Sequence, residues 1–199
     1  SLVLNDLNAR DSGDVSVYAR TLYPSHSGDA EKTFTLVAAE DIGITHHSPF
    51  SLMNMMEPFK YGRGVASGDI NQDGWLDLVF AMPSGVAAYI NVGGKFKRIP
   101  LTLFFSRDLN VFAVALVDLN ADGWLDLYLS TYQSDNIILW NQNGQFDVEQ
   151  PYRFHQPSRV LTIAPGFADL DADGDVDIYE GNWSIGTERN FRPTFSENI

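Results

Sequence analysis

Three copies of one nine-residue pattern constrain this chain more than any other feature. They begin at Asp69, Asp118 and Asp169, and each reads D-x-[ND]-x-D-G-x-x-D. Oxygen-bearing side chains stand at positions 1, 3, 5 and 9, and the glycine at position 6 permits a sharp turn of the backbone. Carboxylate, amide and carbonyl oxygens suit Ca²⁺, which takes about six to eight oxygen ligands and tolerates irregular geometry, whereas Mg²⁺ demands a stricter octahedron. The pattern therefore predicts calcium-binding loops.

The predicted ligands are the side chains at positions 1, 3, 5 and 9 and the main-chain carbonyl at position 7. In the three loops these residues are Asp69, Asn71, Asp73, Trp75 and Asp77; Asp118, Asn120, Asp122, Trp124 and Asp126; and Asp169, Asp171, Asp173, Asp175 and Asp177. We expect about three Ca²⁺ ions. The alternative is acidic turns without metal, because Asp, Asn and Gly are common in ordinary turns. Three copies in register favour calcium.

The flanking residues distinguish these loops from EF-hands. An EF-hand loop has twelve residues, ends in a bidentate Glu and lies between helices, whereas the last acid here is the ninth residue. Short β-rich runs stand on both sides of each loop, at 64–68 and 76–80, at 114–117 and 125–129, and at 166–168 and 176–179. Each loop is therefore predicted to join the two strands of a hairpin.

The spacing of the loops predicts the architecture. The loops start 49 and 51 residues apart, a period typical of propeller blades. Within one period we expect four strands, at 112–118, 125–131, 136–141 and 145–149, and four antiparallel strands make one blade. The prediction is an all-β fold, a β-propeller that is either a whole four-bladed ring or a partial arc.

These loops, their hairpin context and their period resemble the FG-GAP/VCBS repeats of integrin-alpha-type β-propellers. The segment at 34–44 is similar to the lead-in of secreted VCBS-repeat proteins of the ASPIC/UnbV type, and the run at 179–183 is similar to a Y-G-N-W run in that group. The resemblance implies that the loops bind Ca²⁺ for structural purposes. It also implies that the propeller surface binds partners or carries other domains.

Four blade segments follow from the repeats. Residues 1–45 are predicted to form a blade with a degenerate loop, since Arg10 stands at a ligand position and a guanidinium cannot bind a cation. The other segments are 46–106 with the loop 69–77, 107–157 with the loop 118–126, and 158–199 with the loop 169–177. The last segment is either a complete blade or one that lacks outer strands. The linker between the second and third of these loops is expected at 151–157.

Charge and composition restrict the partners. The net charge is −13, and the three loops hold three, three and five of the 26 acidic residues. The acidic balance argues against nucleic acid as a partner. The sequence has no cysteine and no apolar run of the length that spans a bilayer. Weak calcium sites fill where calcium is millimolar, so we expect an extracellular, secreted or cell-surface protein, with the periplasm as an alternative. The short acidic N-terminus does not resemble a signal peptide, so we expect a processed chain or an excised piece.

No catalytic constellation stands out in the sequence. The four histidines, His26, His46, His47 and His155, follow no metalloprotease or nucleophile motif and are expected to be packed or solvated. The methionines at 53–56 are expected to fill core space, with an adaptable binding surface as the alternative. Asn182 begins a formal N-glycosylation motif.

The sequence thus predicts a calcium-stabilised binding or adhesion module that is not an enzyme and has an unidentified protein or glycan partner. One alternative is a carbohydrate-binding propeller or the propeller of a polysaccharide-active enzyme, in which Trp75 and Trp124 stack on sugar. Packing of these indoles in the fold is the preferred interpretation. The other alternative is a structural subunit of a surface assembly. In each case the chain is expected to be part of a larger polypeptide or assembly.

Overall fold

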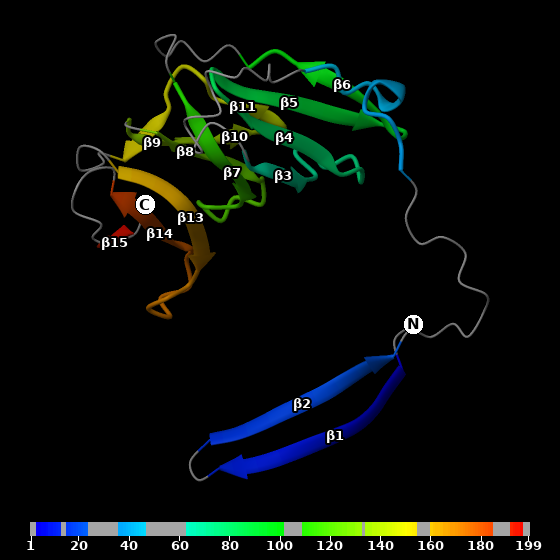
Figure 1. Ribbon diagram of the computed structural model, residues 1–199, viewed down its shortest axis with the longest axis vertical. Helices are drawn as coiled ribbons and strands as arrows, with labels where there is room; N and C mark the ends of the chain where they lie inside the picture. The colour runs from blue at the N-terminus through cyan, green and yellow to red at the C-terminus, as the bar shows by residue number, and fades with distance from the viewer. Residues whose placement is uncertain are drawn as a thin grey trace. The chain divides into compact units, whose positions relative to one another are not determined.

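The computed structural model describes residues 3–12, 15–23, 36–46, 63–101, 109–132, 134–154, 160–184 and 192–196 (Figure 1). The chain divides into two units, Ser1–Val37 and Ala38–Ile199. Every sheet in the described residues is antiparallel, and their one helical element is the three-residue 3-10 helix η1, Glu40–Ile42. No helix in this part of the chain could therefore cross a membrane. The prediction of an all-β fold is confirmed.

The first unit contains one antiparallel hairpin. Strand β1 (Val3–Ser12) pairs with β2 (Val15–Tyr23), and the register runs to the pair Ser12 and Val15. Strand β1 thus continues through the positions that the sequence analysis assigned to a degenerate loop. The physical reason is that Asp11 stands at position 6, where each of the nine-residue loops has its glycine, and the first glycine of the stretch is Gly13. The assignment of residues 1–45 to a blade stays a prediction.

The second unit begins with a four-stranded sheet in which the strand order follows the chain. The strands are β3 (Val65–Gly68), β4 (Asp77–Met82), β5 (Gly85–Val92) and β6 (Lys95–Ile99). Burial alternates strictly along β4, because successive side chains of a strand point to opposite faces. Segment 38–46 is anchored to this sheet, where the backbone N–H groups of Thr45 and His46 donate to the Tyr89 hydroxyl at 3.3 and 3.0 Å.

The middle sheet has the order β12-β9-β8-β7. Its strands are β7 (Val111–Val117), β8 (Asp126–Thr131), β9 (Asn136–Leu139) and β12 (Tyr152–Phe154), and a separate small hairpin consists of β10 (Asn141–Gln142) and β11 (Gln145–Phe146). Three of the four predicted strands are thus found near their predicted positions. The fourth, predicted at 145–149, is found only at Gln145–Phe146 and pairs with β10 outside the four-stranded sheet. The prediction of a linker at 151–157 was wrong for its described part, because Tyr152–Phe154 is the outer strand.

Two local interactions explain where the fourth strand lies. The N–H of Asp147 donates to the carbonyl of Trp140 at 2.8 Å, which closes the β10–β11 hairpin. The Asp147 side chain then accepts the N–H groups of Glu149 and Gln150 at 2.9 and 3.1 Å, so the chain turns at 147–150. It returns to the sheet at Tyr152, which pairs with Ile138.

The last sheet has the order β13-β14-β15, with β13 (Val160–Ala168), β14 (Asp177–Ser184) and β15 (Arg192–Ser196). In each of the three sheets, the predicted loop joins the first strand to the second. The prediction that the loops lie within hairpins is confirmed by the pairing of β3 with β4, β7 with β8 and β13 with β14.

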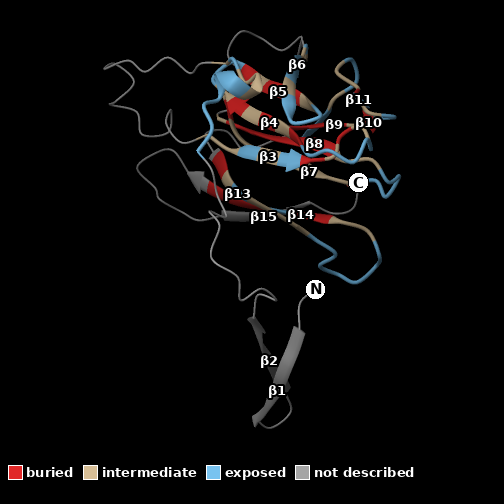
Figure 2. Cartoon of the chain, turned by 90° about the vertical axis from the view of Figure 1, so that its right-hand side faces the viewer, coloured by how far each residue is buried: buried red, intermediate tan, exposed pale blue. Residues whose placement is uncertain are grey.

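The two central strands of the middle sheet are buried on both faces. Every residue of β8 and of β9 is buried, and these strands are red in Figure 2. Leu127 and Leu129 pack in a core with Val79 and Ala88 of the first sheet, whereas Tyr128 packs with Ile178 of the last sheet. The period of two along β8 thus distributes its side chains between two cores. The three sheets are therefore stacked face to face in sequence order.

Candidate metal sites

The three predicted loops share one conformation. We name residues 69–77 loop 1, residues 118–126 loop 2 and residues 169–177 loop 3. Position 4 of each loop has a positive φ, 57° at Gln72, 56° at Ala121 and 63° at Ala172. The glycine at position 6 also has a positive φ in every loop, between 88° and 101°. The glycine was predictable from the sequence. The left-handed residue two positions before it was not, because Gln and Ala carry no signal for that conformation.

The carboxylate at position 1 organises each turn. In loop 1 the Oδ1 atom of Asp69 accepts the N–H of Asp73 at 3.0 Å, and its Oδ2 atom accepts the N–H of Gly74 at 2.8 Å. The same two bonds recur for Asp118 and for Asp169, at 2.8–3.2 Å in the whole set. The position-1 side chain therefore faces the inside of its loop.

Positions 3 and 5 face the same interior. In loop 1 the Oδ1 atom of Asn71 accepts the N–H of Asp73 at 3.2 Å, and the Oδ1 atom of Asp73 accepts the N–H of Trp75 at 2.9 Å. Equivalent bonds are present in loops 2 and 3. The loops therefore bring together the predicted ligands of positions 1, 3 and 5.

The position-9 carboxylate is buried under each loop. Asp77 and Asp126 are fully buried, and the Oδ2 atom of each accepts the N–H of loop position 2 at 2.9 and 3.0 Å. Asp177 makes the same bond, to Leu170, at 2.7 Å. Burial raises the pKa of Asp77 and of Asp126, and two backbone hydrogen bonds to each partly offset the increase. A cation above these carboxylates would favour their charged form.

Loop 3 is the most acidic of the three. The carboxylates of Asp169, Asp171 and Asp177 offer oxygen atoms that all lie within 4.8 Å of one another, close enough to share one metal ion. Desolvation and the charge of Asp173 raise the pKa of Asp171. Hydrogen bonding to the Asp173 side chain, followed by desolvation and nearby carboxylates, raises the pKa of Asp175 to about 6. This crowding of negative charge makes loop 3 a candidate site for a cation.

Asn91 and Asn141 support the loops from outside the predicted pattern. Each donates its backbone N–H to the position-9 carboxylate of its own sheet at 2.8 Å, Asn91 to Asp77 and Asn141 to Asp126. Each side chain also accepts the N–H of a glycine three residues later, at 2.8 and 2.9 Å. The repeated N-x-x-G sequence, at 91–94 and 141–144, was the available signal for this role.

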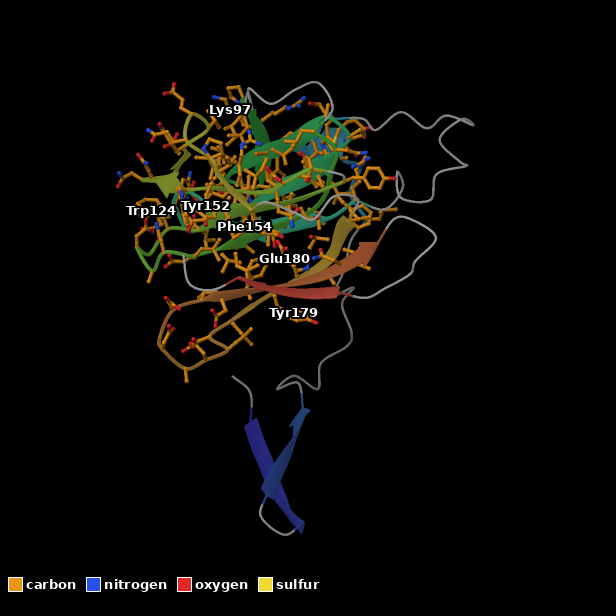
Figure 3. The ribbon with its side chains drawn as sticks, turned by 90° about the vertical axis from the view of Figure 1, so that its left-hand side faces the viewer. Lys97, Trp124, Tyr152, Phe154, Tyr179 and Glu180 are labelled. Atoms are coloured by element: carbon orange, nitrogen blue, oxygen red, sulfur yellow. The ribbon has the colours of Figure 1, made fainter. Side chains whose placement is uncertain are left out.

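The two tryptophans at position 7 differ in their surroundings. Trp75 is 49% exposed and Leu76 next to it is 61% exposed. Trp124 is partly buried, and an added Cβ at Gly144 would lie 3.7 Å from its ring. Figure 3 shows Trp124 on the same side of the sheets as loop 3. The expected packing of both indoles is therefore found for Trp124, whereas half of Trp75 is open to solvent.

Two other candidate residues lie in the described part of the chain, and both make contacts within the fold. His46 packs on Phe80 with ring centroids 4.4 Å apart, and its Nδ1 atom lies 3.1 Å from the Tyr89 hydroxyl. Asn182 is 2% exposed and accepts a hydrogen bond from Thr162 at 2.6 Å, so this folded form does not offer it for glycosylation. The predictions for His26, His47, His155 and the methionines at 53–56 lie outside the described residues.

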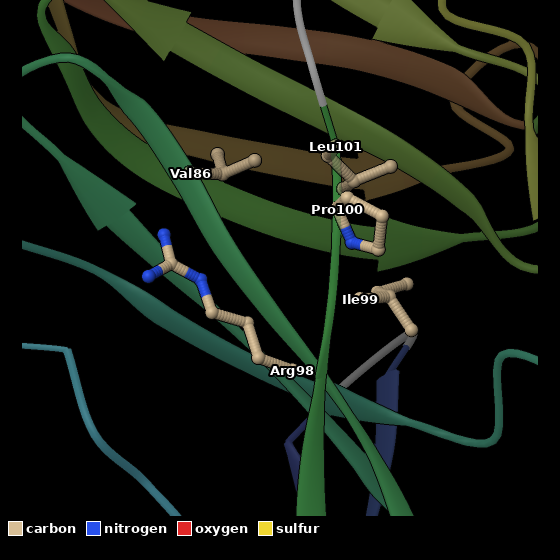
Figure 4. A pocket seen from close by; sticks show the side chains of 5 residues that line it. All are labelled: Val86, Arg98, Ile99, Pro100 and Leu101. Carbon is tan, nitrogen blue, oxygen red and sulfur yellow. The ribbon is translucent and has the colours of Figure 1, made fainter.

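One shallow cavity lies at the end of the first sheet that is opposite loop 1. Its volume is about 360 Å³, and Val86, Arg98, Ile99, Pro100 and Leu101 line it (Figure 4). Arg98 is the one charged side chain of this lining. Such a lining offers no acid–base pair.

Comparison with protein-family models gives two overlapping matches. The model described as FG-GAP-like repeat matches residues 69–129 and 118–180. Each match begins at position 1 of one loop and extends past the following loop, and together they cover more than half of the chain. No curated protein matches the chain significantly.

Proposed function

Because this chain belongs to the family of FG-GAP-like repeat proteins, we propose that loops 1, 2 and 3 each bind one Ca²⁺ ion. The observation that carries the proposal is the convergence of the loop 3 carboxylates of Asp169, Asp171 and Asp177 within 4.8 Å. The same backbone framework holds the oxygens of loops 1 and 2, where Asn71 and Asn120 supply an amide at position 3. Carboxylate and amide oxygens are hard ligands and favour Ca²⁺ over soft transition metals.

The donor geometry leaves room for a metal. A carboxylate oxygen has two lone pairs, so an oxygen that accepts one N–H retains a lone pair for a cation. Three Ca²⁺ ions would reduce the formal charge of the chain from −13 to −7. The ions would thus relieve repulsion within the loops, and we assign them a structural role.

We further propose that the stacked sheets are blades of a β-propeller. The blades would comprise residues 46–106, 107–157 and 158–199, with residues 1–45 as a further blade. Face-to-face stacking of successive sheets through two separate cores supports this architecture. The chain would be a whole four-bladed ring or an arc of a larger one.

The function that we propose is extracellular binding or adhesion without catalysis. Calcium sites on extracellular modules commonly have dissociation constants of about 0.1–1 mM and are filled outside cells. The partner would be a protein or a glycan and would meet a surface that the calcium loops hold in shape. A structural role in a surface assembly would use the same calcium-dependent surface.

Trp75 favours a glycan-binding role as a second candidate. Its half-exposed indole and the exposed Leu76 form an apolar spot on loop 1, and an exposed aromatic face is a platform on which a sugar ring can stack. Trp124 occupies the same loop position but is partly covered. Trp75 is therefore the residue through which we expect a glycan to be recognised.

Thermal unfolding with and without calcium tests the metal proposal. A ligand that binds only the folded state stabilises it by about 2.7 kcal/mol per site at a hundredfold excess over its Kd. We expect EGTA to lower the melting temperature, and we expect a smaller effect in a variant that carries Asp73→Ala, Asp122→Ala and Asp173→Ala together. Asp41→Ala is the control, because it removes an exposed carboxylate outside the loops. An EGTA-insensitive transition together with no metal by elemental analysis would refute the proposal.

A glycan array tests the second candidate. Binding that is lost in Trp75→Ala and retained in Trp124→Ala would support recognition through the exposed indole. Equal binding by the two variants and the parent chain would place glycan recognition away from Trp75, and no binding by any of them would leave the protein-binding role.

A further inference from the structure

Loops 1 and 2 are directly bonded to each other. The side-chain Nε2 atom of Gln72 donates to the carbonyl of Gly123 at 2.8 Å. Gln72 stands between the proposed ligands Asn71 and Asp73, and Gly123 stands between the position-5 and position-7 ligands of loop 2. The bond therefore joins the middle of one proposed calcium cage to the middle of the next.

Asn141 makes a second connection between the same loops. Its side-chain Nδ2 atom donates to the carbonyl of Ile70 in loop 1 at 2.9 Å and to the carbonyl of Leu125 in loop 2 at 3.0 Å. The side chain is buried. The equivalent Asn91 donates to Leu76 of its own loop at 3.2 Å. Asn141 thus fixes the distance between two loops, whereas Asn91 braces one.

The turn that follows Asn141 lies close to loop 1. A Cβ added to Gly144 would lie 3.2 Å from the Cα and 3.3 Å from the Cβ of Asn71, a proposed calcium ligand. The corresponding Gly94 of the first sheet has nothing within 4 Å of such an atom. The backbone of this turn therefore lies close to Asn71.

Loop 3 lacks the side chain that makes the first connection. Ala121 and Ala172 occupy the position of Gln72 in loops 2 and 3, and alanine has no side-chain donor. The Gln72 bond therefore cannot be repeated between loops 2 and 3.

We propose that loops 1 and 2 bind Ca²⁺ as one cooperative pair, with Gln72 and Asn141 as the positioning residues, and that loop 3 binds independently. The inference rests on the proposed calcium binding. A metal ion in loop 1 fixes the backbone around Gln72 and Ile70, and the two connections then hold loop 2 in its binding conformation. The second ion has less conformational entropy to remove and binds more tightly. Repulsion between the two ions opposes this effect and is screened by salt.

Calorimetric titration with CaCl₂ at about 150 mM salt tests the pairing. The Asp173→Ala variant retains intact loops 1 and 2. In this variant we expect the second ion to bind about fivefold more tightly than it would bind if the two sites were independent. A factor of this size lies within the usual range of coupling between sites. Gln72→Ala in this background should lose most of the cooperativity. Gln142→Ala is the matched control, because Gln142 is an exposed glutamine of the adjoining turn.

Reciprocity gives a second test in the full chain. Asp73→Ala should weaken binding at loop 2 about fivefold, and Asp122→Ala should weaken binding at loop 1 by the same factor, because coupling between two sites is mutual. Asp173→Ala should change neither. Calcium binding to independent sites, with Gln72→Ala equal to its parent, would overturn the pairing and leave the proposed function intact. An absence of calcium binding in every variant would overturn both.

Discussion

A buried polar network between the middle and last sheets gives a sharp prediction for Tyr128→Phe. The Tyr128 hydroxyl is fully buried, donates to the Oε1 atom of Glu180 at 2.6 Å and accepts the Nδ2 group of Asn136 at 2.9 Å. Figure 3 shows Glu180 on the face of β14 that meets the middle sheet and Tyr179 on the other face. Burial and then the charge of Glu180 raise the pKa of Tyr128 well above its usual value, so the hydroxyl remains a donor.

The magnitude follows from what the substitution removes. A hydrogen bond to a charged group contributes about 1.5–3 kcal/mol, and Glu180 would lose this one in a dry environment. Asn136 keeps its bonds to Thr162 and Glu180, both at 2.7 Å, so its loss is small. We therefore expect Tyr128→Phe to reduce the free energy of unfolding by about 2 kcal/mol. For a chain of this size the melting temperature should fall by about 4–8 °C.

The assay is thermal unfolding by calorimetry at pH 7.5 with saturating CaCl₂, so that differences in metal content do not contribute. Tyr152→Phe is the control, because the ring of Tyr152 is 43% exposed and its substitution should change the melting temperature by no more than about 2 °C. A Tyr128→Phe variant that melts within 1 °C of the parent would show that the network does not stabilise the sheet contact.

The remaining predictions concern the loops. Separate Asp73→Ala, Asp122→Ala and Asp173→Ala variants should each lose one calcium ion in titrations, and Asp173→Ala should lose the tightest site, because loop 3 has five acids and ligand charge increases affinity. The pKa of Asp175 is raised to about 6, so between roughly pH 4 and 6 the metal-free folded chain binds more protons at this residue than the unfolded chain does. The contribution of this protonated carboxyl to the free energy of unfolding therefore decreases as the pH rises through that window. The proposed ligand atom of Asp175 is its carbonyl oxygen, so Ca²⁺ would oppose protonation of the side chain through its charge. The calcium affinity of loop 3 should therefore fall as the pH drops below about 6, and Asp175→Asn should remove this step from a pH series of titrations. Gly144→Ala should be destabilising by about 1–3 kcal/mol in denaturant unfolding, since its φ is 85° and the new Cβ would press on Asn71. Gly94→Ala, with a φ of 89° and open space, should cost less.

The hairpins and the loop interiors could be predicted because their causes are local. The glycine of position 6 and the oxygen side chains around it lie within nine residues, and each is identifiable by its chemistry. The supports from outside the loops were harder to identify. Asn141 bonds to Ile70 across 71 residues of sequence, and no local pattern indicates which distant carbonyl an asparagine will meet.

Strand β12 was missed for a different physical reason. Pro151 and Pro157 bracket the segment and made it resemble a linker, yet proline is compatible with the residue that precedes an outer strand. The pairing of Tyr152 with Ile138 is a tertiary preference, supported by packing of the Tyr152 ring on Trp140 with centroids 6.4 Å apart. The burial of Glu180 could not be predicted from the sequence either, because its partners Tyr128 and Asn136 belong to another sheet.

Because β8 and β9 are buried on both faces, they should be the last strands to open when the stacked sheets fluctuate. Neither strand can detach until a neighbouring sheet has separated from the middle one, so both depend on two interfaces at once. The amide hydrogens of these strands should therefore exchange with deuterium only in the rarest openings of this part of the chain. The half-life of hydrogen exchange at those amides would measure how cooperatively the stacked sheets open.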